Sequence, residues 1–153
     1  MPERMMPTAS VSQHMPCCAE KVFDLLHDYS RRLEWDTLLR DARLTRGHTR
    51  AALDATSLCV GKPFFGLIGV ETRYVTFKPG VIAAVEMINH PPFFGTFAAS
   101  IRHEEAAAGS LATYKFRFTA KPRFLAWLME PVMLLMLRHE TRRRLAALAN
   151  FLQ

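Results

Sequence analysis

The segment PVMLLMLRHETRRRLAALANFLQ, residues 131–153, decides the fold that we expect for this chain. On a wheel of about 3.6 residues per turn, one narrow face carries Leu134, Leu137, Thr141, Leu145, Leu148 and Leu152. The opposite face carries Val132, His139, Arg143 and Asn150. Glu130 and Pro131 suit a first turn, where an acid meets the positive end of the helix dipole and proline loses no needed hydrogen bond. We therefore predict a long amphipathic helix that requires a broad apolar surface to cover it.

The segments before this helix have residue patterns typical of β-strands. The clearest is the last, where Ala112, Tyr114, Phe116 and Phe118 alternate with polar or charged residues. Such alternation indicates a sheet with one buried and one solvated face, as in antiparallel sheets. The expected strands are residues 10–15, 38–46, 51–60, 69–78, 81–88, 93–102 and 112–119.

Two short helices are expected after the first strand. Ala19, Val22, Phe23 and Leu26 repeat with helical spacing. A further helical turn over 29–33 leads to Trp35, which we interpret as a core anchor because of its size. Residues 1–9 carry little pattern and are expected to be frayed.

The order of these elements predicts an α+β fold in a single domain, residues 1–153. A curved antiparallel sheet of about six to seven strands would wrap around the long C-terminal helix, because many strands with one apolar face twist and curl. A helix and a curved sheet rarely meet along their whole length. We therefore expect an apolar cavity where they diverge.

Composition restricts the functional classes. Half of the 153 residues are apolar, which is enough for one ample core. The net charge of +6 permits anionic partners, but the basic residues are scattered except at 142–144, so no nucleic acid is expected. Cys17, Cys18 and Cys59 suggest reduced thiols in a cytoplasmic protein, and the most apolar window, 124–137, is too short to span a membrane.

The polar motifs of the sequence give little indication of a metal, phosphate or catalytic site. The six histidines lack metal-ligand spacing, so neither a metal nor another cofactor is expected. The three glycines of 61–69 do not lie between a strand and a helix, which argues against a phosphate site. His103, Glu104 and Glu105 are interpreted as the solvated end of a strand. Glu86 is interpreted as outward-facing, with a buried acid of shifted pKa as the alternative.

Several of these segments carry a family resemblance. Ser-Val-x-x-x-Met-Pro at 10–16, Val-Phe-Asp-Leu-Leu-x-Asp at 22–28, Arg-Arg-Leu-Glu-Trp-Asp at 31–36, Thr-Tyr-Lys-Phe-Arg-Phe at 113–118 and the basic leucine helix resemble the helix-grip (START and birch-pollen-allergen-like, SRPBCC) superfamily. Bacterial polyketide cyclase/dehydrase-like proteins are the most similar subgroup. The resemblance implies a cavity between sheet and terminal helix that holds a hydrophobic small molecule or lipid. Its motifs specify the fold better than the function, because they are packing positions.

Three functions are compatible with the sequence. The first is binding or transport of a hydrophobic ligand, in a cavity lined by Met87, Phe97, Tyr114, Phe116, Trp127, Met133 and Met136. The second is a metal-free enzyme resembling cyclases, with Tyr114, Arg102 or His90 steering proton transfer; it ranks lower because no acid/base pair has convincing spacing. The third is a module that binds a partner or a membrane surface.

The apolar start of the terminal helix does not decide between these functions. Residues 124–137 are apolar on every side and need cover on more than one face. Sheet loops or the first helices would cover them, or the second face would line a ligand cavity, contact a second subunit in a homodimer, or touch a membrane.

Overall fold

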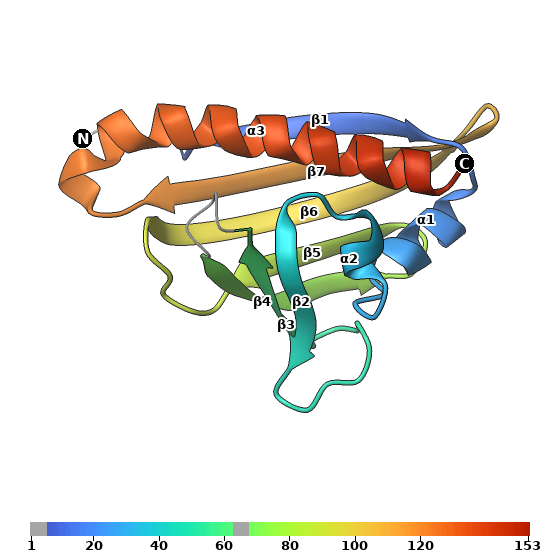
Figure 1. Ribbon diagram of the computed structural model, residues 1–153, viewed down its shortest axis with the longest axis horizontal. Coiled ribbons are helices and arrows are strands. Elements are labelled where there is room, and N and C mark those ends of the chain that lie inside the picture. The colour runs from blue at the N-terminus through green and yellow to red at the C-terminus, as the bar shows by residue number, and fades with distance from the viewer. Residues whose placement is uncertain (1–5, 63–67) are drawn as a thin grey trace.

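The computed structural model describes residues 6–62 and 68–153 (Figure 1). The strands are β1 (Thr8–Met15), β2 (Leu39–Thr45), β3 (Thr56–Gly61), β4 (Gly69–Lys78), β5 (Ile82–Met87), β6 (Phe94–Ala106) and β7 (Gly109–Ala120). The helices are α1 (Ala19–Leu26), α2 (Arg32–Trp35) and α3 (Ala126–Phe151), and the 3-10 turn η2 (Arg123–Leu125) precedes α3.

One antiparallel sheet contains all seven strands, in the order β1-β7-β6-β5-β4-β3-β2. Helix α3 runs along β1 and β7, while α1 and α2 lie at the end of the sheet near the C-terminus (Figure 1). This arrangement confirms the predicted α+β fold, with a curved sheet around a long terminal helix. The strands β2 to β5 curve away from α3, so the close packing of this helix on the sheet is with β1 and β7, at one edge (Figure 1).

The main core lies where the C-terminal half of α3 meets α1, α2 and β1. Leu145 is only 3% exposed, and Leu148 and Met15 are fully buried beside it. Trp35 belongs to the same cluster, which confirms its interpretation as a core anchor. The leucine face of the wheel therefore identified the side of α3 that packs on the sheet.

Several element boundaries differ from the prediction, including that of β3, which begins at Thr56 and not at residue 51. Helix α3 begins at Ala126, so Pro131 lies inside the helix, at an exposed position, where it has no N–H to donate to the carbonyl group of Trp127. Strand β1 begins at Thr8, and Ala9 is buried, so these two residues are not frayed. The expectation for residues 1–5 lies outside the described residues.

Strand β6 is longer than predicted and forms a hairpin with β7. Its pairing with β7 continues to Ala106 and Gly109. Gly109 has a φ of +148°, and a Cβ atom there would collide with the carbonyl group of Met15. Only glycine lets the hairpin approach the end of β1 so closely.

No helix in the described ranges 6–62 and 68–153 is long and apolar enough to cross a membrane.

Candidate ligand cavity

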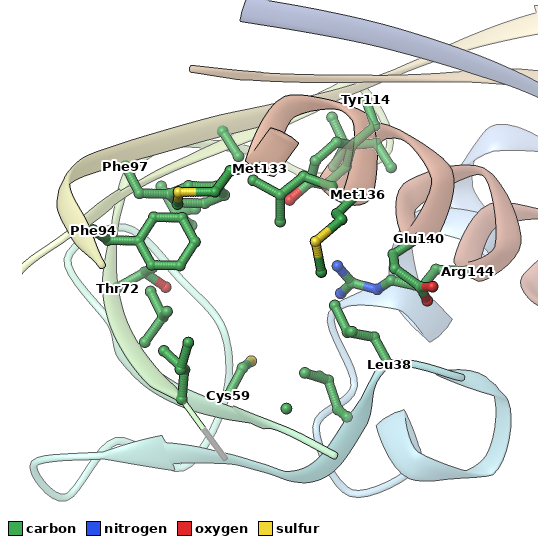
Figure 2. Close-up of a pocket in the computed structure, with 18 of the residues that line it drawn as sticks. Leu38, Cys59, Thr72, Phe94, Phe97, Tyr114, Met133, Met136, Glu140 and Arg144 are labelled. Atoms are coloured by element: carbon green, nitrogen blue, oxygen red, sulfur yellow. The ribbon is translucent and has the colours of Figure 1, made fainter. Parts of the chain in front are cut away.

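A cavity of about 670 Å³ lies between α3 and the strands that curve away from it (Figure 2). This volume falls within the range of roughly 300 to 1,000 Å³ that is usual for small-molecule sites. The cavity exists because the C-terminal half of α3 is anchored in the core, whereas its N-terminal half does not pack closely on β2 to β5 in the part of the chain that the structure describes.

The walls of the cavity are mostly apolar. Phe94 and Phe97 of β6 meet edge to face, with ring centroids 5.9 Å apart. Met133 and Met136 face them from α3 (Figure 2). Methionine side chains are unbranched and polarizable, so they adapt to ligands of irregular shape.

The other end of the cavity is charged. Arg32 and Arg144 line it, and both hold the carboxylate of Asp36. Arg32 donates from Nε to Oδ2 at 2.9 Å, and Arg144 donates from Nη2 to the same oxygen at 2.9 Å. The Asp36 side chain has no exposed surface. In Figure 2, Arg144 and Glu140 lie at the end opposite Phe94 and Phe97.

The ionisation of Asp36 depends on these arginines. Burial opposes the charged form, but the guanidinium groups of Arg144 and Arg32 outweigh it and lower the pKa of Asp36 to about 2. Asp36 is therefore a carboxylate at neutral pH. It ties α2, through Arg32, to α3, through Arg144.

A hydrogen-bonded chain forms another part of the wall. Nδ1 of His27 lies 2.7 Å from the hydroxyl of Tyr74, which lies 3.0 Å from the hydroxyl of Tyr29. Tyr29 in turn donates to Ser57. Burial lowers the pKa of His27 to about 3, and the charge of Arg32 and, when protonated, of His103 adds to this effect. Burial raises the pKa of Tyr29 and of Tyr74, so all three groups are neutral at pH 7.

The structure brings together four of the seven residues predicted to line a cavity: Phe97, Tyr114, Met133 and Met136. Met87 and Phe116 do not line it but pack in the neighbouring cluster around Phe94 and Phe118. Trp127 lies outside the cavity and is 65% exposed. A contact of any of these residues with a ligand stays a prediction.

Trp127 also shows that the start of α3 is not covered on every side. Leu135 is 66% exposed, and Phe124 is 76% exposed. The expectation that loops or the first helices would cover this segment is therefore wrong for its outer face.

Of the residues named for proton transfer, only Tyr114 lines the cavity. Arg102 and His90 are exposed and lie elsewhere. Glu86 forms a half-exposed ion pair with Arg73 at 2.7 Å, as its outward-facing interpretation requires.

The prediction for His103 is wrong, because this side chain is only 4% exposed. It packs against Phe23 of α1, and neither ring nitrogen has a hydrogen-bond partner within residues 6–62 and 68–153. Burial lowers its pKa to about 4.

Sequence reasoning missed the charged end of the cavity. One signal was available, because Arg144 follows Leu137 by seven residues and so falls on the leucine face of the wheel. Another was the spacing of Arg32 and Asp36, which lets them pair one helical turn apart. No signal predicted that Arg144 would reach Asp36 across 108 positions of the chain.

Within residues 6–62 and 68–153, no group of three His, Cys, Asp or Glu side chains could hold a metal ion.

Residues 6–153 match the family described as polyketide cyclase / dehydrase and lipid transport. The chain belongs to this family. Among curated proteins, none matches the sequence.

Solved structures show the same fold at low sequence identity. The aromatase/cyclase Zhui from a Streptomyces species has a TM-score of 0.77 at 11% identity, with 97% of this chain and 94% of that chain covered. A START superfamily protein from Mycobacterium smegmatis has a TM-score of 0.74 at 8% identity, covering 94% and 98%. The protein XoxI from Bacillus cereus has a TM-score of 0.75 at 15% identity, covering 96% of each chain. At such identities the likeness concerns the fold alone.

Proposed function

We propose that this protein binds a hydrophobic small molecule or lipid in the cavity between α3 and the sheet. The observation that carries the proposal is the cavity itself, about 670 Å³ with mostly apolar walls. Protein cores are normally packed with few voids larger than a water molecule, so a space of this size is unusual unless something fills it.

The energetics favour an apolar occupant. Each buried CH₂ group contributes about 0.8 kcal/mol, part of which is offset by the entropy lost on association. A micromolar dissociation constant, about −8 kcal/mol, is then a reasonable expectation. The methionines of α3 would adapt to the ligand, and the aromatic rings of β6 would form a firm opposite wall.

The test is saturable binding of the neutral dye Nile red and its loss in a variant with a filled cavity. Met133→Trp adds volume inside the cavity and should weaken binding at least about tenfold, while the melting temperature stays equal or rises. Leu135→Trp is the matched control, because Leu135 lies on the same helix, outside the cavity and 66% exposed. Binding that is not saturable would refute the proposal, as would equal weakening by both variants.

The second candidate is a cyclase- or dehydratase-like enzyme acting on an apolar or aromatic substrate. The series of hydrogen bonds from His27 through Tyr74 to Tyr29 favours this function, because these residues line the cavity and could relay a proton. It ranks second because acid–base catalysis works best with a pKa near 7, and burial moves the pKa of each group away from that value. An enzyme of this kind would convert an aromatic polyketone, and Tyr74→Phe would stop conversion while Nile red still binds. Unchanged conversion in Tyr74→Phe would remove the relay from consideration.

A further inference from the structure

The charged end of the cavity contains two guanidinium groups, of Arg32 and Arg144, together with the carboxylates of Asp36 and Glu140 (Figure 2). Arg32 and Arg144 share the carboxylate of Asp36, so these two guanidinium groups carry one positive charge more than the acid that joins them. Glu140 pairs with Arg143 instead, because its Oε1 accepts from Arg143 at 3.4 Å and no ion pair joins it to Arg144 within the described residues. The other oxygen of Glu140, Oε2, is buried and has no hydrogen-bond partner in the same part of the chain. An excess of buried positive charge on the two guanidinium groups is costly, and a ligand anion would relieve that cost.

Unused hydrogen-bond donors accompany this charge. Arg144 binds Asp36 through Nε and Nη2, which leaves Nη1 with no acceptor in the described part of the chain. Arg32 uses Nε and Nη1, which leaves Nη2. The hydroxyl of Tyr114 is likewise unpaired among these residues, and protein atoms do not fully enclose any of the three groups.

These three side chains are neighbours. Tyr114, Arg32 and Arg144 line the large cavity and also border a second void of about 20 Å³. They come from β7, α2 and α3, so the fold itself brings the donors together. The apolar walls at Phe94 and Phe97 begin at the other end (Figure 2).

We propose that this end of the cavity binds the carboxylate of an amphipathic ligand, whose apolar body extends towards Phe94 and Phe97. The ligand class is a long-chain or aryl carboxylic acid. Guanidinium groups suit carboxylates because their N–H groups match the two oxygens in geometry and charge. This inference rests on the proposed function and specifies the head group that the cavity selects.

The first test varies the ligand and leaves the protein unchanged. Dodecanoate, dodecanol and methyl dodecanoate displace Nile red at about pH 8, where the free acid is ionised. We expect dodecanoate to bind at least about tenfold more tightly than the ester or the alcohol. Equal affinities for all three would overturn the head-group assignment and leave the apolar cavity intact. Failure of Nile red itself to bind would instead refute the proposed function.

The second test varies the protein. Tyr114→Phe removes only a hydroxyl that is unpaired among the described residues, so it should weaken dodecanoate about threefold to tenfold, and more than it weakens methyl dodecanoate, while the melting temperature stays unchanged. Arg144→Gln should weaken dodecanoate more strongly, and Arg142→Gln is its control because Arg142 is an exposed residue of the same helix. Loss of acid and ester affinity by the same factor would overturn the proposal. If Arg144→Gln does not fold, Tyr114→Phe and the ligand series decide the outcome.

Discussion

Replacing Asp36 by asparagine should destabilise the protein strongly, because Asp36 is the one carboxylate that Arg32 and Arg144 share. Its side chain has no exposed surface, and both of its oxygens accept hydrogen bonds. Asparagine has a similar shape but no charge, so two cations would face each other in the interior. Removing one partner of a buried ion pair typically costs about 3 to 5 kcal/mol.

The pKa of Asp36 gives a second measure of this effect. Its value falls from 3.8 to about 2 on folding, which corresponds to about 2 kcal/mol in favour of the ionised form. Because the pKa is lowered in the folded state, this stabilisation is present above pH 3.8 and disappears as the pH falls towards 2. The stability difference between parent and Asp36→Asn should narrow over the same range.

Urea unfolding at neutral pH measures the effect. We expect Asp36→Asn to lower the free energy of unfolding by about 3 kcal/mol. The control is Asp41→Asn, because Asp41 pairs with the exposed Arg43 at 3.1 Å and such surface pairs contribute about 1 kcal/mol or less. A loss in Asp36→Asn no larger than that in Asp41→Asn would refute the assignment of Asp36 as the shared counter-ion.

Three further predictions concern the packing of Leu145, the titration of the buried His103 and the effect of chelation on the melting temperature. Leu145→Asp places a carboxylate in an apolar contact and should cost several kcal/mol, so an unchanged melting temperature would show that Leu145 does not pack on the sheet. Burial lowers the pKa of His103 from 6.5 to about 4, so its contribution to stability is complete above pH 6.5 and is lost as the pH falls towards 4. His103→Leu should flatten that part of the pH–stability curve, and an identical slope would contradict the reasoning. Exhaustive chelation should leave the melting temperature unchanged, because the described histidines and cysteines do not cluster; a large drop would identify a bound metal.

The sequence predicted the parts of the fold that depend on local periodicity. The leucine face of α3, the spacing of Val22, Phe23 and Leu26 in α1, and the alternation along β7 each fix which side of an element is buried. The cavity followed from the architecture, because a straight helix cannot follow a curved sheet throughout.

Features that depend on contacts between distant segments were not predictable in this way. Strand β6 continues to Ala106 because it pairs with β7, and this extension puts His103 on the same buried face as Ala99 and Ile101. Helix α1 then covers His103 with Phe23. The pairing of Arg144 with Asp36 joins two helices at opposite ends of the chain, so it appears only when the fold is assembled.

Native mass spectrometry of the purified protein, followed by organic extraction, shows whether a hydrophobic molecule occupies the cavity. We expect a stoichiometric added mass that organic solvent releases as a hydrophobic molecule, and an emptied protein that takes up Nile red saturably. A protein that carries only its own mass and also fails to bind Nile red saturably would contradict the claim that this cavity is a ligand site.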